Sequence, residues 1–241
     1  KDSLQQIPLQ LEFRPQSHTA GLAPYFREYL RGYMKQWIKD YEKRTGRELD
    51  LYSGGLKIYT TINAEMQQNA EEAVQEHLSN YQRIFDIIKE DRKYGPFYFD
   101  EDPAGNVKRI VDRAMKNTQR YRGMKRRGAS QDSIQKAFNT PIPMTVFTWN
   151  GDKDTVLSPR DSIVYYKGLY QVGMMSVEPQ SGHVKAWVGG NDYQYFKYDH
   201  VKQGKRQVGS TFKPFVYASA ILEKNYSPCL QVPNAKICIE K

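Results

Sequence analysis

Two serines in the chain are each followed, three residues later, by a lysine, a spacing that can build a nucleophile and its base. They are Ser133 with Lys136, and Ser210 with Lys213. On a helix, a lysine at this spacing lies one turn after the serine, beside the hydroxyl whose proton its amine would take. Because free lysine is protonated at neutral pH, the amine must also be desolvated or lie near another cation.

The surroundings of the two serines differ. Ser133 lies in a run of charged and polar residues, where a lysine stays solvated and keeps its proton. Ser210 follows a predicted pair of strands, and Gly209 before it allows the backbone to turn tightly. We therefore interpret Ser133 as structural, and we predict that Ser210 is a nucleophile and Lys213 its base.

A helix is expected to begin at Ser210, where free N–H groups and the helix dipole favour a developing anion. The residues expected to bury its first turn are Phe212, Pro214, Phe215 and Val216. Their burial would desolvate the Lys213 amine. The alternative is that Ser210 only starts a helix and that Lys213 is a solvated neighbour.

Several elements are predicted before this pair. Apolar residues every three or four positions predict a long helix over 24–45 that stops at Gly46, with an aromatic stripe packed on a neighbour. Residues 56–62 alternate like a half-buried strand, and Asn63 can cap the helix that follows. The buried face of that helix is expected to contain Met66, Ala70, Ala73, Val74, His77 and Leu78.

Order is expected to weaken over 81–143 and to return in two hairpins with a helix between them. The first hairpin pairs 144–149 with 155–157 around Asn150 and Gly151, and the second pairs 172–177 with 183–188. The intervening helix is predicted to open at Ser158 and Pro159 and to run to about Leu169.

Charge is concentrated in one segment. The formal net charge is +9, and residues 108–127 alone hold nine lysines and arginines against one acid, Asp112. This block could dock on an anionic partner, but its single aromatic residue, Tyr121, argues against nucleic acid. The histidines show no metal-ligand spacing, so no metal or cofactor is expected. Cys229 and Cys238 could bridge a short loop or remain free thiols.

Three segments, in order, resemble the class A penicillin-binding proteins, which are bifunctional peptidoglycan glycosyltransferase/transpeptidases. Residues 54–62 resemble the strand after that family's glycosyltransferase domain. Residues 175–190 resemble the hairpin that opens its transpeptidase domain, and 205–217 resemble its active-site helix, with Val208 where the family usually has proline.

The resemblance implies an α+β fold. In this fold, a linker region of helices and short strands leads into the N-terminal part of a transpeptidase domain. That domain is serine β-lactamase-like, and this chain is expected to contain only part of it. We expect residues 1–23 to be the tail of a glycosyltransferase domain, 24–143 the inter-domain linker with a basic insertion at 108–127, and 144–241 the start of the transpeptidase domain.

By the same resemblance, Ser210 would attack the D-Ala-D-Ala end of a peptidoglycan stem peptide, with Lys213 taking its proton, and β-lactams would acylate the same serine. The resemblance places the full-length protein on the extracytoplasmic, periplasmic face of the cytoplasmic membrane. Since the chain opens at Lys1 without methionine and has no span of its own, any membrane anchor is expected to lie outside it.

The family's later Ser-x-Asn and Lys-Thr-Gly motifs do not occur between Ser210 and Lys241. We therefore expect this chain by itself to show little or no acylation by penicillin. The alternatives are a serine β-lactamase or penicillin-sensing domain, which share the Ser-x-x-Lys helix, or a non-catalytic linker module that binds an anionic partner through residues 108–127.

Overall fold

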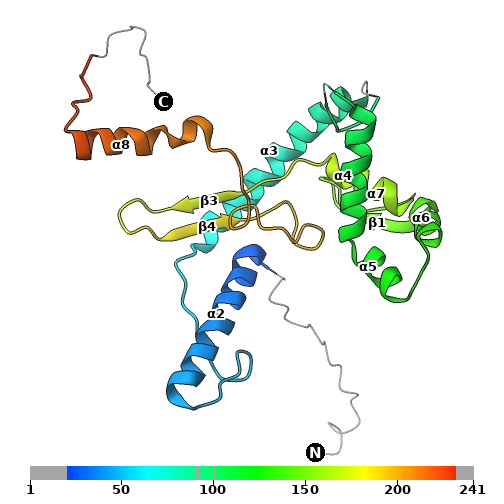
Figure 1. Cartoon of the computed structure of the whole chain (residues 1–241). Coiled ribbons are helices and arrows are strands. Elements are labelled where there is room, and N and C mark those ends of the chain that lie inside the picture. The colour runs from blue at the N-terminus through cyan, green and yellow to red at the C-terminus, as the bar shows by residue number, and fades with distance from the viewer. Residues whose placement is uncertain (1–20, 91–92, 100, 232–241) are drawn as a thin grey trace, which may run out of the picture. The chain divides into compact units, whose positions relative to one another are not determined.

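The computed structural model describes residues 21–231, apart from residues 91, 92 and 100. These residues form helices and two small antiparallel sheets, which confirms the predicted α+β class (Figure 1). The chain divides into two compact units, one of residues 1–204 and one of residues 205–241.

The long amphipathic helix predicted near the start of the described chain is α2 (Pro24–Thr45). It ends as expected at Gly46, whose φ of 69° is a left-handed conformation that glycine adopts without strain. Tyr25 is buried, and Tyr29 stacks on Trp187 with ring centroids 5.3 Å apart. Farther along the helix Tyr33 is 58% exposed, and Trp37 stacks on Tyr41 of the same helix, so the aromatic contacts of α2 with β4 come from its N-terminal half.

The next helix, α3 (Ala64–Glu90), is longer than predicted because it continues through residues that were expected to lose order. Its start is as predicted, since Asn63 Oδ1 accepts a hydrogen bond from the Met66 N–H at 2.9 Å. The predicted buried face is partly wrong. Met66, Ala73 and His77 are exposed.

The positions that α3 does bury are Gln67, Ala70, Val74 and Gln82. Ala70 and Val74 were predicted correctly, but a glutamine counts as polar in a hydrophobic pattern, so the pattern missed Gln67 and Gln82. In the structure the amides of both glutamines bond to backbone groups, which removes the cost of burying them.

The second predicted hairpin is present as β3 (Met174–Val177) and β4 (Val184–Val188), paired antiparallel. One face of β4 packs against α3. The small core between them consists of Ala70, Val74, Ala186 and Val188. This packing holds the hairpin on the longest helix of the larger unit.

Residues 56–62 do not form the predicted strand. At the end of this segment the Thr61 hydroxyl donates to the Val184 carbonyl at 2.7 Å, and the Asn63 N–H donates to the Lys185 carbonyl at 2.9 Å. These two bonds join the segment to β4, but a strand requires a continuous ladder of backbone bonds. Most of its side chains are exposed, with Tyr59 at 89%. Alternation alone therefore did not produce a half-buried strand.

The stretch predicted to be weakly ordered is instead helical, in α4 (Pro103–Asn117), α5 (Gln119–Arg126) and α6 (Gln131–Asn139). The core beneath these helices contains Met115, Ile134 and Phe138, with Ile163 packed against it. The basic block is thus the outer side of folded helices and not a loose insertion. Its charges obscured the amphipathic spacing of the few apolar residues between them.

The first predicted hairpin and the following helix are present. β1 (Ile142–Val146) pairs with β2 (Lys153–Leu157) in an antiparallel register that matches Ile142 with Leu157. α7 (Pro159–Lys167) follows, and the Ser158 hydroxyl accepts from the Asp161 N–H at 3.0 Å as an N-cap.

Candidate functional site

The predicted nucleophile and base lie on consecutive turns of one helical segment in the smaller unit. Ser210 belongs to the short 3-10 turn η1 (Gly209–Phe212), and Lys213 is the first residue of α8 (Lys213–Lys224). The Lys213 N–H donates to the Ser210 carbonyl, which fixes the two residues one turn apart. Gly209 has a φ of 50°, so the tight turn predicted before the serine is present.

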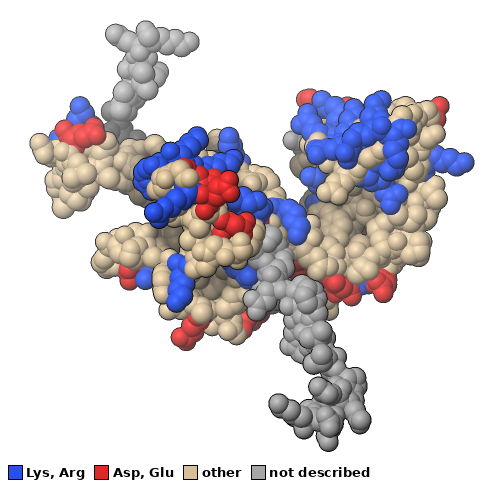
Figure 2. All heavy atoms as spheres, turned by 90° about the horizontal axis from the view of Figure 1, so that it is seen from below, with Lys and Arg blue, Asp and Glu red and all other residues tan. Residues whose placement is uncertain are grey.

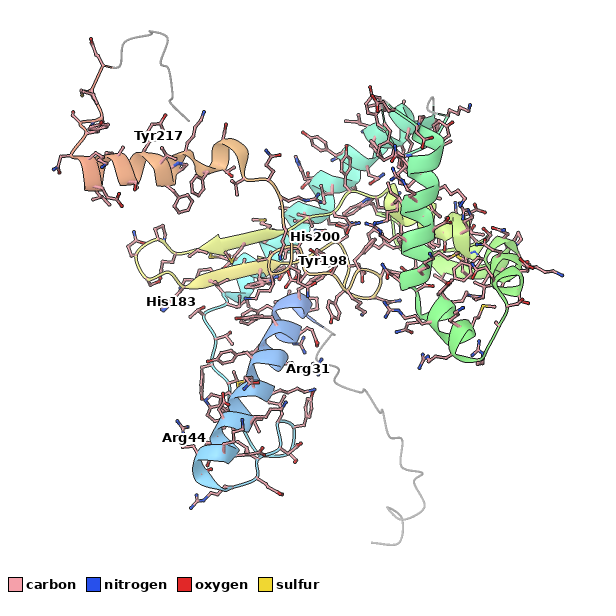
Figure 3. The ribbon with its side chains drawn as sticks, in the orientation of Figure 1. Arg31, Arg44, His183, Tyr198, His200 and Tyr217 are labelled. Carbon is pink, nitrogen blue, oxygen red and sulfur yellow. The ribbon has the colours of Figure 1, made fainter. Side chains whose placement is uncertain are left out.

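The predicted burial of this first turn is wrong for the described residues. Phe212 is 51% exposed and Phe215 is 67% exposed, and the side chains of Ser210 and Lys213 are also exposed. Figure 3 shows Tyr217 projecting outward from α8. An amphipathic helix buries its apolar stripe only against another element. Among the described residues of 205–241 the helical elements are η1 and α8 themselves, so nothing in that unit covers the stripe.

The second Ser-x-x-Lys match lies at the start of α6. Ser133 lies in the first turn of α6, where its N–H donates to the Ser130 hydroxyl at 3.2 Å. Ser133 and Lys136 are both exposed. Ser130 is the N-cap of α6, and its hydroxyl also donates to the Ser133 Oγ at 2.9 Å, so the Ser133 side chain takes part in a local cap contact.

The hairpin that precedes the candidate site carries a buried polar cluster that pattern reasoning missed. The Trp187 indole N–H donates to Asp199 Oδ2 at 3.1 Å, and Asp199 Oδ1 accepts the Val201 N–H at 2.9 Å. The His200 N–H donates to the Gly189 carbonyl at 2.7 Å, so the loop after β4 returns onto the strand. Several N–H groups donate to the Asp199 carboxylate, which offsets the cost of burying it.

Tyr25 connects α2 to this cluster. Its hydroxyl donates to the Phe196 carbonyl at 2.7 Å. Burial, with a smaller effect of Asp192, raises the pKa of the Tyr25 hydroxyl well above its ordinary value, so the group stays neutral and remains a donor. A Cβ at Gly189 or Gly190 would overlap the Tyr25 ring. The glycine pair therefore lets the end of β4 approach α2 closely, a requirement of tertiary contact that no local pattern reveals.

Asp112 is the single acid of the basic block, and it links α4 to α7. Lys108 Nζ lies 3.0 Å from Asp112 Oδ2, and Arg160 Nη1 lies 3.1 Å from Asp112 Oδ1. Partial burial raises the pKa of Asp112, but the bonds from Lys108 and Arg160 outweigh it and hold that pKa below its ordinary value.

We expect Asp112→Asn to lower the free energy of unfolding by about 1 kcal/mol at neutral pH, a small value because the pair is partly exposed. A carboxyl whose pKa is lowered by folding stabilises the fold above its unfolded pKa, near 4, and that contribution is lost as pH falls through the folded pKa. The difference between wild type and Asp112→Asn in urea denaturation should therefore shrink below about pH 4. A difference that stayed constant down to pH 3 would contradict this assignment.

Among the described residues, no three histidine, cysteine, aspartate or glutamate side chains gather as a metal site would require. No described helix is long and apolar enough to cross a membrane. Cys229 is exposed and Cys238 lies outside the described residues, so the bridge between them stays a prediction.

Comparisons with known proteins agree on one family. Residues 92–170 match the family model of the penicillin-binding protein middle domain. Penicillin-binding protein 1A of Haemophilus influenzae is 25% identical to this chain over 230 residues, covering 89% of this chain and 26% of that protein. These similarities support the chain as a fragment of a class A penicillin-binding protein. The resemblance inferred from three short segments is thereby confirmed.

Other penicillin-binding proteins also match most of this chain. Penicillin-binding protein 1A of Escherichia coli is 27% identical and matches over 83% of this chain and 25% of its own length. Penicillin-binding protein 2D of Bacillus subtilis is 28% identical, over 67% of this chain and 20% of its own length. The chain spans about a quarter of the length of the first curated relatives it matches.

Proposed function

We propose that this penicillin-binding protein segment supplies the nucleophile and base of a peptidoglycan D,D-transpeptidase. The observation that carries the proposal is the placement of Ser210 and Lys213 on consecutive turns directly after the left-handed Gly209. Family membership supports the same pair, because the segment that contains it resembles the family's active-site helix.

In the proposed reaction, the neutral Lys213 amine takes the Ser210 proton as Oγ attacks the carbonyl carbon of the penultimate D-Ala. The tetrahedral oxyanion is stabilised by backbone N–H groups, including that of Ser210. The peptide bond then breaks, and the terminal D-Ala leaves with a proton. The acyl group passes from Ser210 to an amine of a second stem peptide, which restores the hydroxyl and forms the cross-link. A β-lactam would acylate the same oxygen.

The wider assignment is also a proposal. It comprises the domain division at 23/24 and 143/144, membrane association through an anchor outside this chain, and action at the periplasmic face on lipid-linked and nascent peptidoglycan. The family model spans both sides of 143/144. Within residues 92–170, α7 contacts α4, α6 and β2, so the proposed boundary at 143/144 marks a change of segment along the sequence and does not separate two independently packed bodies.

The test is acylation by a fluorescent penicillin in two proteins. One is the present chain. The other is a chimera in which residues 24–228 replace the matching segment of the Haemophilus influenzae relative, so that Ser210 is tested within a full-length family member. We expect one label per chimera and little or no label on the present chain.

Trypsin separates the two candidate serines, because Ser133 falls in the peptide 128–136 and Ser210 in the peptide 207–224. The proposal requires the acyl group on the peptide 207–224, identified by mass spectrometry. A label on the peptide 128–136, or a folded chimera that acquires no label, would show that Ser210 is not the nucleophile.

A further inference from the structure

A groove of about 400 Å³ is lined by residues of α4 and by the last residue of α7. These residues belong to the larger unit, whereas Ser210 and Lys213 belong to the smaller one. Its α4 residues recur every three or four positions, so they form one face of the helix. Arg109 and Arg113 are one turn apart on this face, and Lys167 of α7 supplies a third cation. Figure 2 shows lysine and arginine side chains gathered over one side of the part that holds these helices.

The positive charge of the groove is not compensated by acids. No aspartate or glutamate lines it. The one acid of the basic block, Asp112, is already bonded to Lys108 and Arg160. Three cationic side chains therefore face a shared space with no carboxylate among the groove's lining residues, an arrangement that repels cations and attracts anions.

The groove also offers directed hydrogen-bond donors. The Asn106 Oδ1 accepts from Arg109 Nη2, which orients the guanidinium while leaving other N–H groups available. Asn117 lies at the other end of the same helix face, and Ile110 and Ala114 form an apolar floor between the two ends. Two guanidinium groups one turn apart match the several oxygens of a phosphate or diphosphate better than they match a single carboxylate.

The residues near the groove argue against two other kinds of partner, the interior of a lipid bilayer and a nucleic acid. Among the described residues of α4, α5 and α6, no large apolar side chain is exposed, so these helices present no side chain for insertion into a bilayer core. Tyr121 packs against Phe138 with ring centroids 6.4 Å apart, so it is not free to stack on nucleic-acid bases. Binding here must rest on charge and hydrogen bonds.

We infer that the α4–α7 groove is a binding site for a phosphate-bearing group, held by Arg109, Arg113 and Lys167. The group is a diphosphate or phosphate monoester, either free in solution or carried by a lipid headgroup. This site is independent of Ser210 and Lys213, so its test does not depend on acylation.

The test uses the full 241-residue chain and two probes, inorganic diphosphate followed by titration calorimetry and phosphatidic acid vesicles, whose headgroup is a phosphate monoester, followed by sedimentation. The groove variant is Arg109→Gln with Arg113→Gln. The matched control is Arg122→Gln with Arg126→Gln, which removes the same charge from exposed positions of α5 outside the groove. Glutamine keeps helix propensity, and circular dichroism checks that all three proteins remain folded.

We expect the groove variant to bind diphosphate about tenfold more weakly than wild type, and the control to change by about twofold or less. Diphosphate binding without vesicle adsorption would identify a soluble or pendant phosphate, and vesicle adsorption lost in the groove variant would identify a lipid headgroup. Equal losses in both variants would show that only diffuse charge attracts anions. That result, or the absence of binding to both probes, would overturn the inference.

Discussion

Lys213→Ala is expected to slow acylation of Ser210 by penicillin about 10³-fold in the chimera with the Haemophilus influenzae relative. The serine hydroxyl has too high a pKa to ionise by itself, and Lys213 is the base one turn away on the same helical segment. The measurement is the second-order rate constant for covalent labelling, followed by fluorescence in a gel.

Two further variants separate the role of a base from that of a charge. Lys213→Arg keeps the positive charge, but a guanidinium does not give up its proton in proteins, so labelling should be about as slow as in Lys213→Ala. Lys136→Ala, in the other Ser-x-x-Lys match, should label at the wild-type rate. Rapid labelling of Lys213→Arg would show that the residue acts only through its charge.

Gln67→Leu is expected to lower the free energy of unfolding by about 3 kcal/mol. Gln67 is fully buried, and its side chain pairs with both backbone groups of one residue of β4. Gln67 Nε2 donates to the Trp187 carbonyl at 3.0 Å, and the Trp187 N–H donates to Gln67 Oε1 at 2.7 Å. Leucine fills a similar volume but leaves both backbone groups buried without partners, which costs more than a lost surface bond.

Gln68→Leu is the matched control, because the neighbouring residue faces solvent. Its side chain donates to Glu72 Oε1 at 2.8 Å on the exposed side of α3, so its loss should change stability by about 0.5 kcal/mol or less. Urea denaturation followed by circular dichroism measures both variants. Similar effects in the two would mean that the Gln67 amide does not hold β4 on α3.

Local signals in the sequence determined where several elements begin and turn. Asn63 and Ser158 cap their helices, Gly46 ends α2, and Gly209 turns the chain before Ser210. Each of these effects acts within a few residues of backbone, so it depends on neighbours that are adjacent in sequence. The proposed pair, Ser210 and Lys213, is predicted from the same kind of local context.

Long-range contacts decided what local signals did not. α3 buries Gln67 and Gln82 because β4 and the segment after α7 offer backbone partners, and those partners lie 120 and 86 residues away in sequence. Residues 56–62 alternate like a strand but do not acquire a ladder. The basic block folds because Met115 meets Phe138 beneath it.

The same distinction applies to the candidate site. The sequence by itself determined the spacing of Ser210 and Lys213 and the turn that precedes them, because one helical turn fixes both. Whether the Lys213 amine is desolvated depends on which element covers Phe212 and Phe215, and both are exposed among the described residues. Burial is a property of two packed surfaces, so the apolar pattern of one helix could predict the stripe but only tertiary structure decides whether it is covered.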